Sequence, residues 1–173
     1  MPSNVEIKAV VRDMGFLKER AKELSRSEGT VIHQQDTFFN VEKGRLKLRR
    51  FQDGTGQLIF YERPDMDGPK LSNYSISLTN DPEGLAKVLS DALGVKGIVK
   101  KERHLYLVGQ TRIHVDSVEG LGQFMELEVV MKEGQGVEEG EAIAQELMQQ
   151  LGVKREDLIV GAYMDLLMAA KSG

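Results

Sequence analysis

Eight short segments of the chain have the residue pattern of β-strands, with β-branched and aromatic residues or alternating apolar and polar residues. They cover residues 4–11, 31–40, 45–52, 57–63, 73–79, 99–108, 111–116 and 123–131. Turn-forming stretches separate several of them, namely "EKG" at 42–44, "DGTG" at 53–56 and "GQ" at 109–110. Turns this short connect antiparallel strands. Closure of the sheet is expected, because it removes exposed strand edges.

Four further segments have apolar residues at helical spacing. The first covers about residues 14–28, with Asp13 as its N-cap and Gly29 as its expected end. The others run from Asp81-Pro82 to Gly94, near 138–151, and over a late stretch that carries Tyr163, Leu166, Leu167 and Ala170. No linker or repeat divides the chain. The sequence therefore predicts one α+β domain over residues 1–173, an eight-stranded closed antiparallel β-barrel with helices packed outside.

Composition excludes several classes of protein. The chain has 173 residues, with 23 Lys and Arg against 27 Asp and Glu, and the net charge of -4 gives no basic footprint for nucleic acid. The absence of cysteine excludes disulfides, thiolate metal sites and a cysteine nucleophile. No apolar run approaches the roughly 18 residues that a membrane span needs. The N-terminus has no apolar signal core, so we expect a cytoplasmic protein without a membrane partner.

Several strands are charged on one face and apolar on the other. In "RLKLRRFQ" at 45–52, Lys47 and Arg49 alternate with leucines. In "QFMELEVVM" at 123–131, Glu126 and Glu128 share a face roughly 7 Å apart, and such carboxylates repel unless a cation lies between them. A solvated sheet face is one interpretation of each strand taken alone. Such a face usually mixes charges of both signs, whereas these strands each carry one sign.

The alternative interpretation turns the charged faces inward, into a closed barrel. The lumen would then contain the cations Lys8, Lys47, Arg49, Lys101 and Arg103 and the anions Glu6, Asp116, Glu126 and Glu128. Confined charges are costly unless something pairs with them. A polyphosphate with a divalent metal satisfies both sets, because Lys and Arg bind phosphate oxygens and carboxylates bind Mg²⁺ or Mn²⁺. Phosphoryl transfer is the chemistry that such a lumen favours.

At these residues the chain resembles the CYTH family, also called triphosphate tunnel metalloenzymes, and in particular its class IV adenylate cyclase-type branch. The matching pieces, in order, are "VEIKA", "DTFF", "RLKLR", "KERHLYLVG", "IHVDSVEGLGQFMELE" and "AYMDLL". The family opens with Glu-x-Glu-x-Lys, and the corresponding residues here run from Asn4 through Glu6 to Lys8. The resemblance implies an eight-stranded tunnel, in agreement with the strand pattern.

The resemblance also implies roles for individual residues. The implied metal ligands are Glu6, Asp116, Glu126 and Glu128, and the implied catalytic residues are Glu6, Lys8 and Glu126. The implied substrate-binding residues are Lys8, Lys47, Arg49, Lys101 and Arg103, and Arg63, next to Glu62, is a further candidate for this role. Two positions depart from the family pattern: Asn4 replaces a glutamate, and Glu62 stands where cyclase-type relatives have a lysine.

Three functions follow as expectations. The first is metal-dependent hydrolysis of a phosphoanhydride in inorganic tripolyphosphate, a nucleoside triphosphate or thiamine triphosphate. The second is a class IV adenylate cyclase that makes cyclic AMP and pyrophosphate from ATP. The third is a non-catalytic protein that binds polyphosphate or nucleotide, which the changes at Asn4 and Glu62 suggest. A triphosphate-containing small molecule is the expected partner of each, with the protein a monomer or a homodimer.

Overall fold

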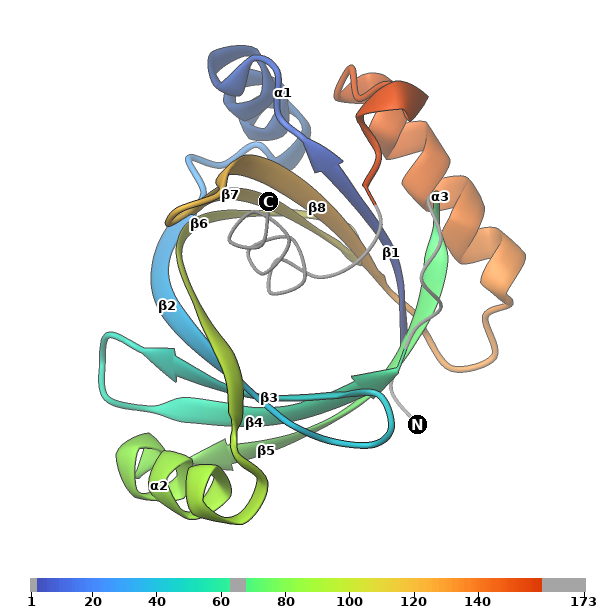
Figure 1. Cartoon of the computed structure of the whole chain (residues 1–173). Coiled ribbons are helices and arrows are strands. Elements are labelled where there is room, and N and C mark those ends of the chain that lie inside the picture. The colour runs from blue at the N-terminus through green and yellow to red at the C-terminus, as the bar shows by residue number, and fades with distance from the viewer. Residues whose placement is uncertain (1–2, 63–67, 160–173) are drawn as a thin grey trace.

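The computed structural model describes residues 3–62 and 68–159, and its eight strands form a closed barrel (Figure 1). The order around the barrel is β1-β5-β4-β3-β2-β6-β7-β8, every neighbouring pair is antiparallel, and β8 pairs with β1 to close it. The strands are β1 (Ser3–Val10), β2 (Thr30–Phe39), β3 (Arg45–Phe51), β4 (Gly56–Glu62), β5 (Lys70–Thr79), β6 (Val95–Val108), β7 (Thr111–Val118) and β8 (Gly122–Val130). The predicted closed antiparallel barrel is confirmed.

Two strands begin earlier than their local pattern predicts. β5 begins at Lys70, and the added residues 70–72 pair with 4–6 of β1. β6 begins at Val95, and its first residues pair with the end of β2. Both extensions depend on strands distant in sequence, so local alternation gave no sign of them.

Three helices lie outside the barrel in the described part of the chain: α1 (Met14–Ser25), α2 (Pro82–Leu93) and α3 (Val137–Gln150). Figure 1 shows α1 and α3 beside β1 and α2 on the far side of the barrel, where α2 packs against Phe39 of β2 and Leu48 of β3. Asp13 and Asp81 cap α1 and α2 by accepting hydrogen bonds from backbone N–H groups, as the sequence predicts. The predicted late helix around Tyr163 lies outside the described residues, and so does Arg63.

The end of the first helix differs from the prediction. α1 stops at Ser25, because Arg26 adopts a left-handed conformation with φ of 55° and closes the last turn. Gly29, the expected end, lies beyond the helix against Tyr106, and a Cβ there would approach the Tyr106 ring to 2.6 Å. The prediction was wrong because a non-glycine residue took the left-handed position that glycine usually fills.

The apolar core lies outside the barrel, between the strands and the helices. The outward residues of β1, β7 and β8 pack against α1 and α3 in one buried cluster that includes Val5, Ile7, Ile113, Val115, Met125, Leu127, Leu17, Ala144 and Leu147. A second layer forms where α2 covers Phe39 and Leu48. Because the apolar parity of β1, β7 and β8 points to these helices, the charged parity of the same strands points into the barrel.

Gly140 of α3 is expected to tolerate no side chain. An added Cβ would lie 2.6 Å from Met131 Sδ and 2.7 Å from Val5 Cγ2, closer than atoms pack. We expect Gly140→Ala to lower the free energy of unfolding by about 1–3 kcal/mol in urea denaturation, despite the better helix propensity of alanine. Glu139→Ala, exposed on the same helix, should change it by less than about 0.5 kcal/mol. Equal values for both variants would contradict close packing of α3 on β1.

None of the helices in the described ranges is long and apolar enough to cross a membrane.

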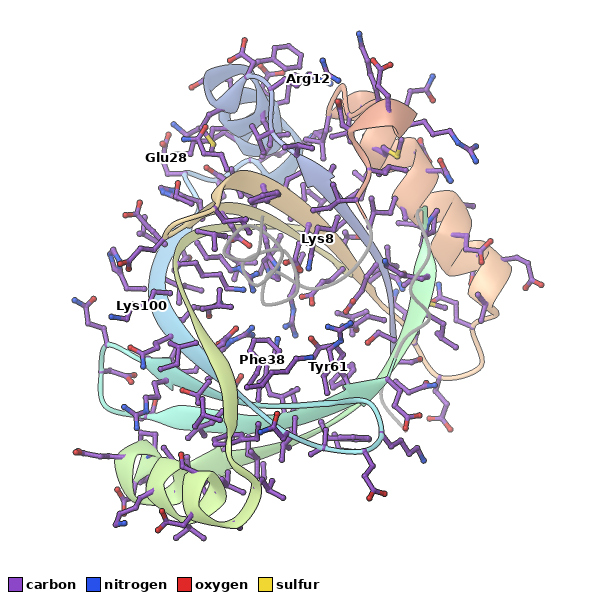
Figure 2. The ribbon with its side chains drawn as sticks, viewed as in Figure 1. Lys8, Arg12, Glu28, Phe38, Tyr61 and Lys100 are labelled. Carbon is purple, nitrogen blue, oxygen red and sulfur yellow. The ribbon has the colours of Figure 1, made fainter. Side chains whose placement is uncertain are left out.

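Figure 2 shows Lys8, Phe38 and Tyr61 directed toward the inside of the ring of strands, whereas Lys100 and Glu28 lie at its outer side. The interior of the barrel is therefore where charged and aromatic side chains meet.

Candidate active site

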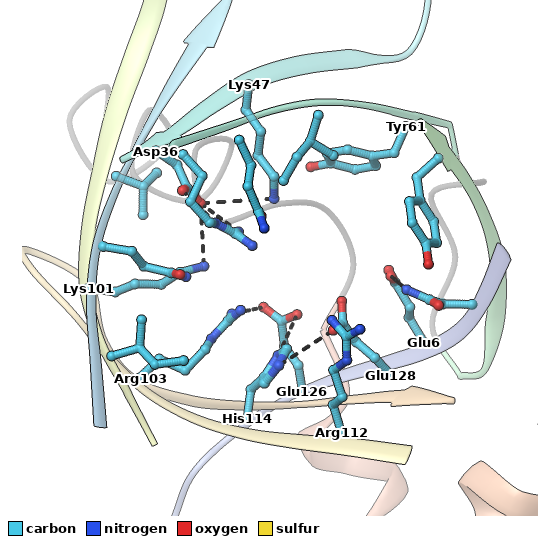
Figure 3. Close-up of a pocket in the computed structure, with 18 of the residues that line it drawn as sticks. Glu6, Asp36, Lys47, Tyr61, Lys101, Arg103, Arg112, His114, Glu126 and Glu128 are labelled. Carbon is cyan, nitrogen blue, oxygen red and sulfur yellow. Dashed lines mark hydrogen bonds and ion pairs between the residues drawn. The ribbon is translucent and has the colours of Figure 1, made fainter. Parts of the chain in front are cut away.

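The barrel encloses a cavity of about 330 Å³ to which all eight strands contribute side chains (Figure 3). Its lining includes most of the charged residues that the sequence places inside: Glu6, Lys8, Lys47, Arg49, Lys101, Arg103, Glu126 and Glu128. The expectation that the charged faces share one cavity is confirmed, since Lys47 of β3 and Glu126 of β8 both line it.

One part of the cavity wall holds a group of cations around Asp36 of β2. The Arg49 guanidinium donates two hydrogen bonds to the Asp36 carboxylate, at 2.8 and 2.9 Å. Lys47 Nζ and Lys101 Nζ lie 3.9 and 3.6 Å from Asp36 Oδ2. The pairing of β2 with β3 and β6 produces this arrangement, because β2 lies between the two strands that carry the cations.

A second pair of charges anchors Arg103. Its guanidinium donates two hydrogen bonds of 2.8 Å to the fully buried carboxylate of Asp116, its partner in strand register. Arg103 Nη2 also reaches Glu126 Oε1 at 3.5 Å. We expected Asp116 to lie beside the metal ligands. Its carboxylate instead pairs with Arg103, and Asp116 does not line the cavity.

Opposite the cations, three residues could hold a metal ion. His114, Glu126 and Glu128 each offer one ligand atom, and these atoms lie within 4.8 Å of one another. His114 Nδ1 is buried and has no hydrogen-bond partner among the described residues. His114 Nδ1 lies 4.0 Å from Glu126 Oε2 and Nε2 lies 3.5 Å from Glu128 Oε1. An imidazole with a buried, unpartnered nitrogen beside two carboxylates is a donor set that fits a divalent cation.

The electrostatics of this group favour metal binding at neutral pH. Burial, assisted by Arg103, lowers the pKa of His114, so its imidazole is neutral and keeps a lone pair to donate. Burial would raise the pKa of Glu126, but Lys8, His114 and Arg103 hold it well below its ordinary value. Glu126 is therefore an ionised carboxylate. Its Oε1 lies 3.8 Å from Lys8 Nζ.

Asn4 and Glu6 extend the polar wall along β1. Asn4 Nδ2 donates to Glu6 Oε2 at 3.4 Å. Asn4 Oδ1 is buried and has no hydrogen-bond partner within the part of the chain that the structure describes. Asn4 therefore retains an oxygen that can serve a ligand in the cavity, although it lacks the charge of the glutamate in the family motif.

The wall formed by β3, β4 and β5 is largely aromatic and aliphatic, which the sequence did not reveal. It contains Phe51, Ile59, Tyr61, Tyr74 and Ile76. Lys47 Nζ lies 4.9 Å from the centre of the Tyr61 ring and 5.7 Å from that of Phe38. This wall can contact an uncharged or flat part of a ligand while the charged wall binds its anionic part.

Glu62 does not enter the cavity. Tyr61 lines it, so the next residue along β4 points outward, and Glu62 pairs with Lys43 at 3.3 Å. Sequence reasoning did not single out Asp36 or assign His114 to the metal group. Both have the inward parity of their strands, at "DTFF" and "IHVD", and that parity was the signal that could have identified them.

The chain is similar to several known proteins. A family model described as the CYTH domain matches residues 3–163. A Methanocaldococcus jannaschii protein, provisionally named as an adenylate cyclase, is 25% identical over 172 residues, which cover 94% of this chain and 97% of that protein. A Pyrococcus horikoshii structure has a TM-score of 0.82 at 24% identity, covering 95% and 99% of the two chains.

A Hippeastrum structure is more distant. It has a TM-score of 0.67 at 14% identity and covers 96% of both chains. It is described as that of an adenylyl cyclase candidate that reveals a dominant triphosphatase activity. At these identities the two solved structures establish a shared fold.

Proposed function

The chain belongs to the CYTH domain family, and from this premise we propose that it is a divalent-metal-dependent enzyme that hydrolyses a phosphoanhydride bond of a triphosphate. The observation that carries the proposal is the division of one cavity into two charged walls. Lys47, Arg49 and Lys101 lie on one side, and His114, Glu126 and Glu128 on the other. A phosphate chain can bind the cations while its metal ion binds the carboxylates.

The cations would bind and orient the phosphate chain. Arg49 and Arg103 are already fixed by bidentate bonds to Asp36 and Asp116, so binding requires little further ordering of these two side chains. Positive charge fixed around the reacting phosphate stabilises the charge that develops on its oxygens. Most of the rate enhancement in phosphoryl transfer is expected to come from this positioning and neutralisation.

The residues that would hold the metal are His114, Glu126 and Glu128, with Glu6 and Asn4 beside them, and we propose Mg²⁺ or Mn²⁺ as the ion. Such an ion supplies Lewis acidity and neutralises phosphate charge when it is bound. Glu126 would also keep Lys8 in place, since their charged atoms lie 3.8 Å apart. Lys8 would then face the phosphate chain as an ammonium donor.

We favour hydrolysis over cyclisation because the two charged walls can bind the phosphate chain and its metal, and hydrolysis needs no other part of the substrate to be bound. The Hippeastrum relative, named as a cyclase and described as mainly a triphosphatase, is in keeping with this choice. Adenylate cyclase activity remains the second candidate. The aromatic wall with Tyr61 and Tyr74 favours it, because that wall can contact a nucleobase. The name of the Methanocaldococcus jannaschii relative points the same way.

The deciding experiment measures products from three substrates: tripolyphosphate, ATP and thiamine triphosphate, each with Mg²⁺ and with Mn²⁺. We expect phosphate release that disappears when EDTA removes the metal. Cyclic AMP and pyrophosphate from ATP, without release of inorganic phosphate, would favour the cyclase. Binding of all three substrates without any product would contradict both enzymes and favour a non-catalytic binding protein.

A further inference from the structure

Asp36 is an anion placed where an anionic substrate is expected to bind. Its carboxylate is 1% exposed and lies between β3 and β6. Arg49, Lys47 and Lys101 all point to it, with nitrogen–oxygen distances of 2.8 to 3.9 Å (Figure 3). A carboxylate here weakens attraction of phosphate, so a binding site built only for charge would omit it.

Removal of this carboxylate would leave the cations in mutual repulsion. Three positive charges surround one negative charge, which leaves a net charge of about two at this part of the wall. Asp36 is the carboxylate that Lys47 and Lys101 share, so its removal takes away the ion pairs that draw these long side chains together.

We propose that Asp36 is a positioning residue that gathers Lys47, Arg49 and Lys101 into one preassembled phosphate-binding site. The inference rests on the proposed function only in naming a phosphate chain as the anion. The arrangement of the cations is a property of the ligand-free protein. Asp36 thus reduces the attraction of the site for phosphate, and in return it holds the three basic side chains in place.

The pKa of Lys47 depends on this arrangement of charges. Burial lowers the pKa of the Lys47 ammonium well below its ordinary value, Arg49 and Lys101 lower it further, and Asp36 opposes them. The charged and titratable groups that face Lys47 are Asp36 of β2, Arg49 of β3, Tyr61 of β4, Lys101 of β6 and Glu126 of β8. Burial would raise the pKa of Asp36 itself, but Arg49, Lys101 and Lys47 hold it far below its usual range.

Asp36 and Arg49 have opposite effects on the pKa of Lys47. Asp36→Asn removes a group that favours the protonated form of Lys47, so the pKa of Lys47 must fall. An opposite charge at this distance typically shifts a pKa by about one to three units. Arg49→Met removes a group that disfavours the protonated form, so it should move the pKa of Lys47 upward.

Lysine side-chain NMR of the ligand-free protein tests the proposal directly. Protein labelled with ¹³C-lysine is titrated, and the Lys47 signal is assigned from its loss in Lys47→Met. We expect the midpoint for Lys47 to fall by about one to three pH units in Asp36→Asn and to rise in Arg49→Met. Glu102→Gln is the control, because this carboxylate of β6 points outward and bonds His104. It should leave the midpoint unchanged.

Binding of tripolyphosphate without metal provides the functional measurement, by titration calorimetry from pH 6 to pH 9. Asp36→Asn should come closest to the affinity of wild type at pH 6, the end of the range that most favours protonated lysines. Above the lowered midpoint of Lys47, the variant has lost this positive charge and should bind tripolyphosphate at least about tenfold more weakly than wild type. A tenfold change in affinity has the same free energy as a shift of one pKa unit. A misfolded variant would instead lose affinity at every pH.

The outcomes separate the positioning role from the proposed function. An unchanged Lys47 midpoint in both Asp36→Asn and Arg49→Met would overturn the positioning role, whatever the protein binds. Shifted midpoints without any tripolyphosphate binding to wild type would retain the positioning of the cations and refute phosphate as their anion. If Asp36→Asn is unfolded, Arg49→Met decides the question, because Asp36 then acts on Lys47 without the arginine that opposes it. A Lys47 midpoint that does not rise in Arg49→Met would overturn the positioning role.

Discussion

Replacing Glu126 by Gln is expected to abolish most of the stabilisation that Mg²⁺ or Mn²⁺ gives the folded protein. A metal at a hundred times its dissociation constant stabilises by about 2.7 kcal/mol. For a chain of this size that corresponds to a rise in melting temperature of roughly 5–10 °C. Glu126 shares its group with His114 and Glu128. A neutral amide would leave those two as the remaining carboxylate and imidazole, and it would remove the negative charge 3.8 Å from Lys8 Nζ.

Differential scanning fluorimetry across a metal titration measures this effect. Phosphate release by Glu126→Gln should fall about a hundredfold or more, as when a group that stabilises the transition state is lost. Glu102→Gln on the outer face should keep both the melting shift and the rate, since its carboxylate contacts His104. An unchanged metal-dependent melting shift in Glu126→Gln would contradict its role as a ligand.

Removal of a tunnel arginine is expected to produce the second large effect. Arg49→Ala and Arg103→Ala should each weaken tripolyphosphate binding roughly ten- to a hundredfold, because charge-assisted hydrogen bonds contribute about 1.5–3 kcal/mol each. The loss includes a second component. Each guanidinium also neutralises a buried aspartate, Asp36 or Asp116, which would be left without its strongest partner.

Arg50 provides the matched control for these variants. It follows Arg49 along β3 and has the opposite parity, on the outer face of the barrel, and it does not line the tunnel cavity. Arg50→Ala should leave the affinity near that of wild type, because this half-buried side chain lies outside the cavity in which tripolyphosphate would bind. Equal affinity in all three variants, with folding verified by circular dichroism, would refute a role for the tunnel arginines in binding.

The sequence by itself was sufficient for the barrel and for the inward direction of most of its charged side chains. Period-two alternation is a local property, so "NVEIKAVV" already places Glu6 and Lys8 on one face and Val5 and Ile7 on the other. Short turns made the neighbours antiparallel. The single sign of charge on the polar faces of residues 45–52 and 123–131 indicated an interior rather than a solvated surface, and the structure confirmed that interior.

Only the tertiary structure decided which charges pair. Arg49 meets Asp36 and Arg103 meets Asp116, each thirteen residues away on another strand, because strand register brings these residues opposite one another. Alternation fixes the face of a side chain and leaves its height and its neighbour across the barrel undetermined. The joining of His114 to Glu126 and Glu128 likewise depends on the register between β7 and β8. Closure of the barrel then places the cations around Asp36 across one cavity from His114, Glu126 and Glu128. A local sequence pattern contains no information about this arrangement.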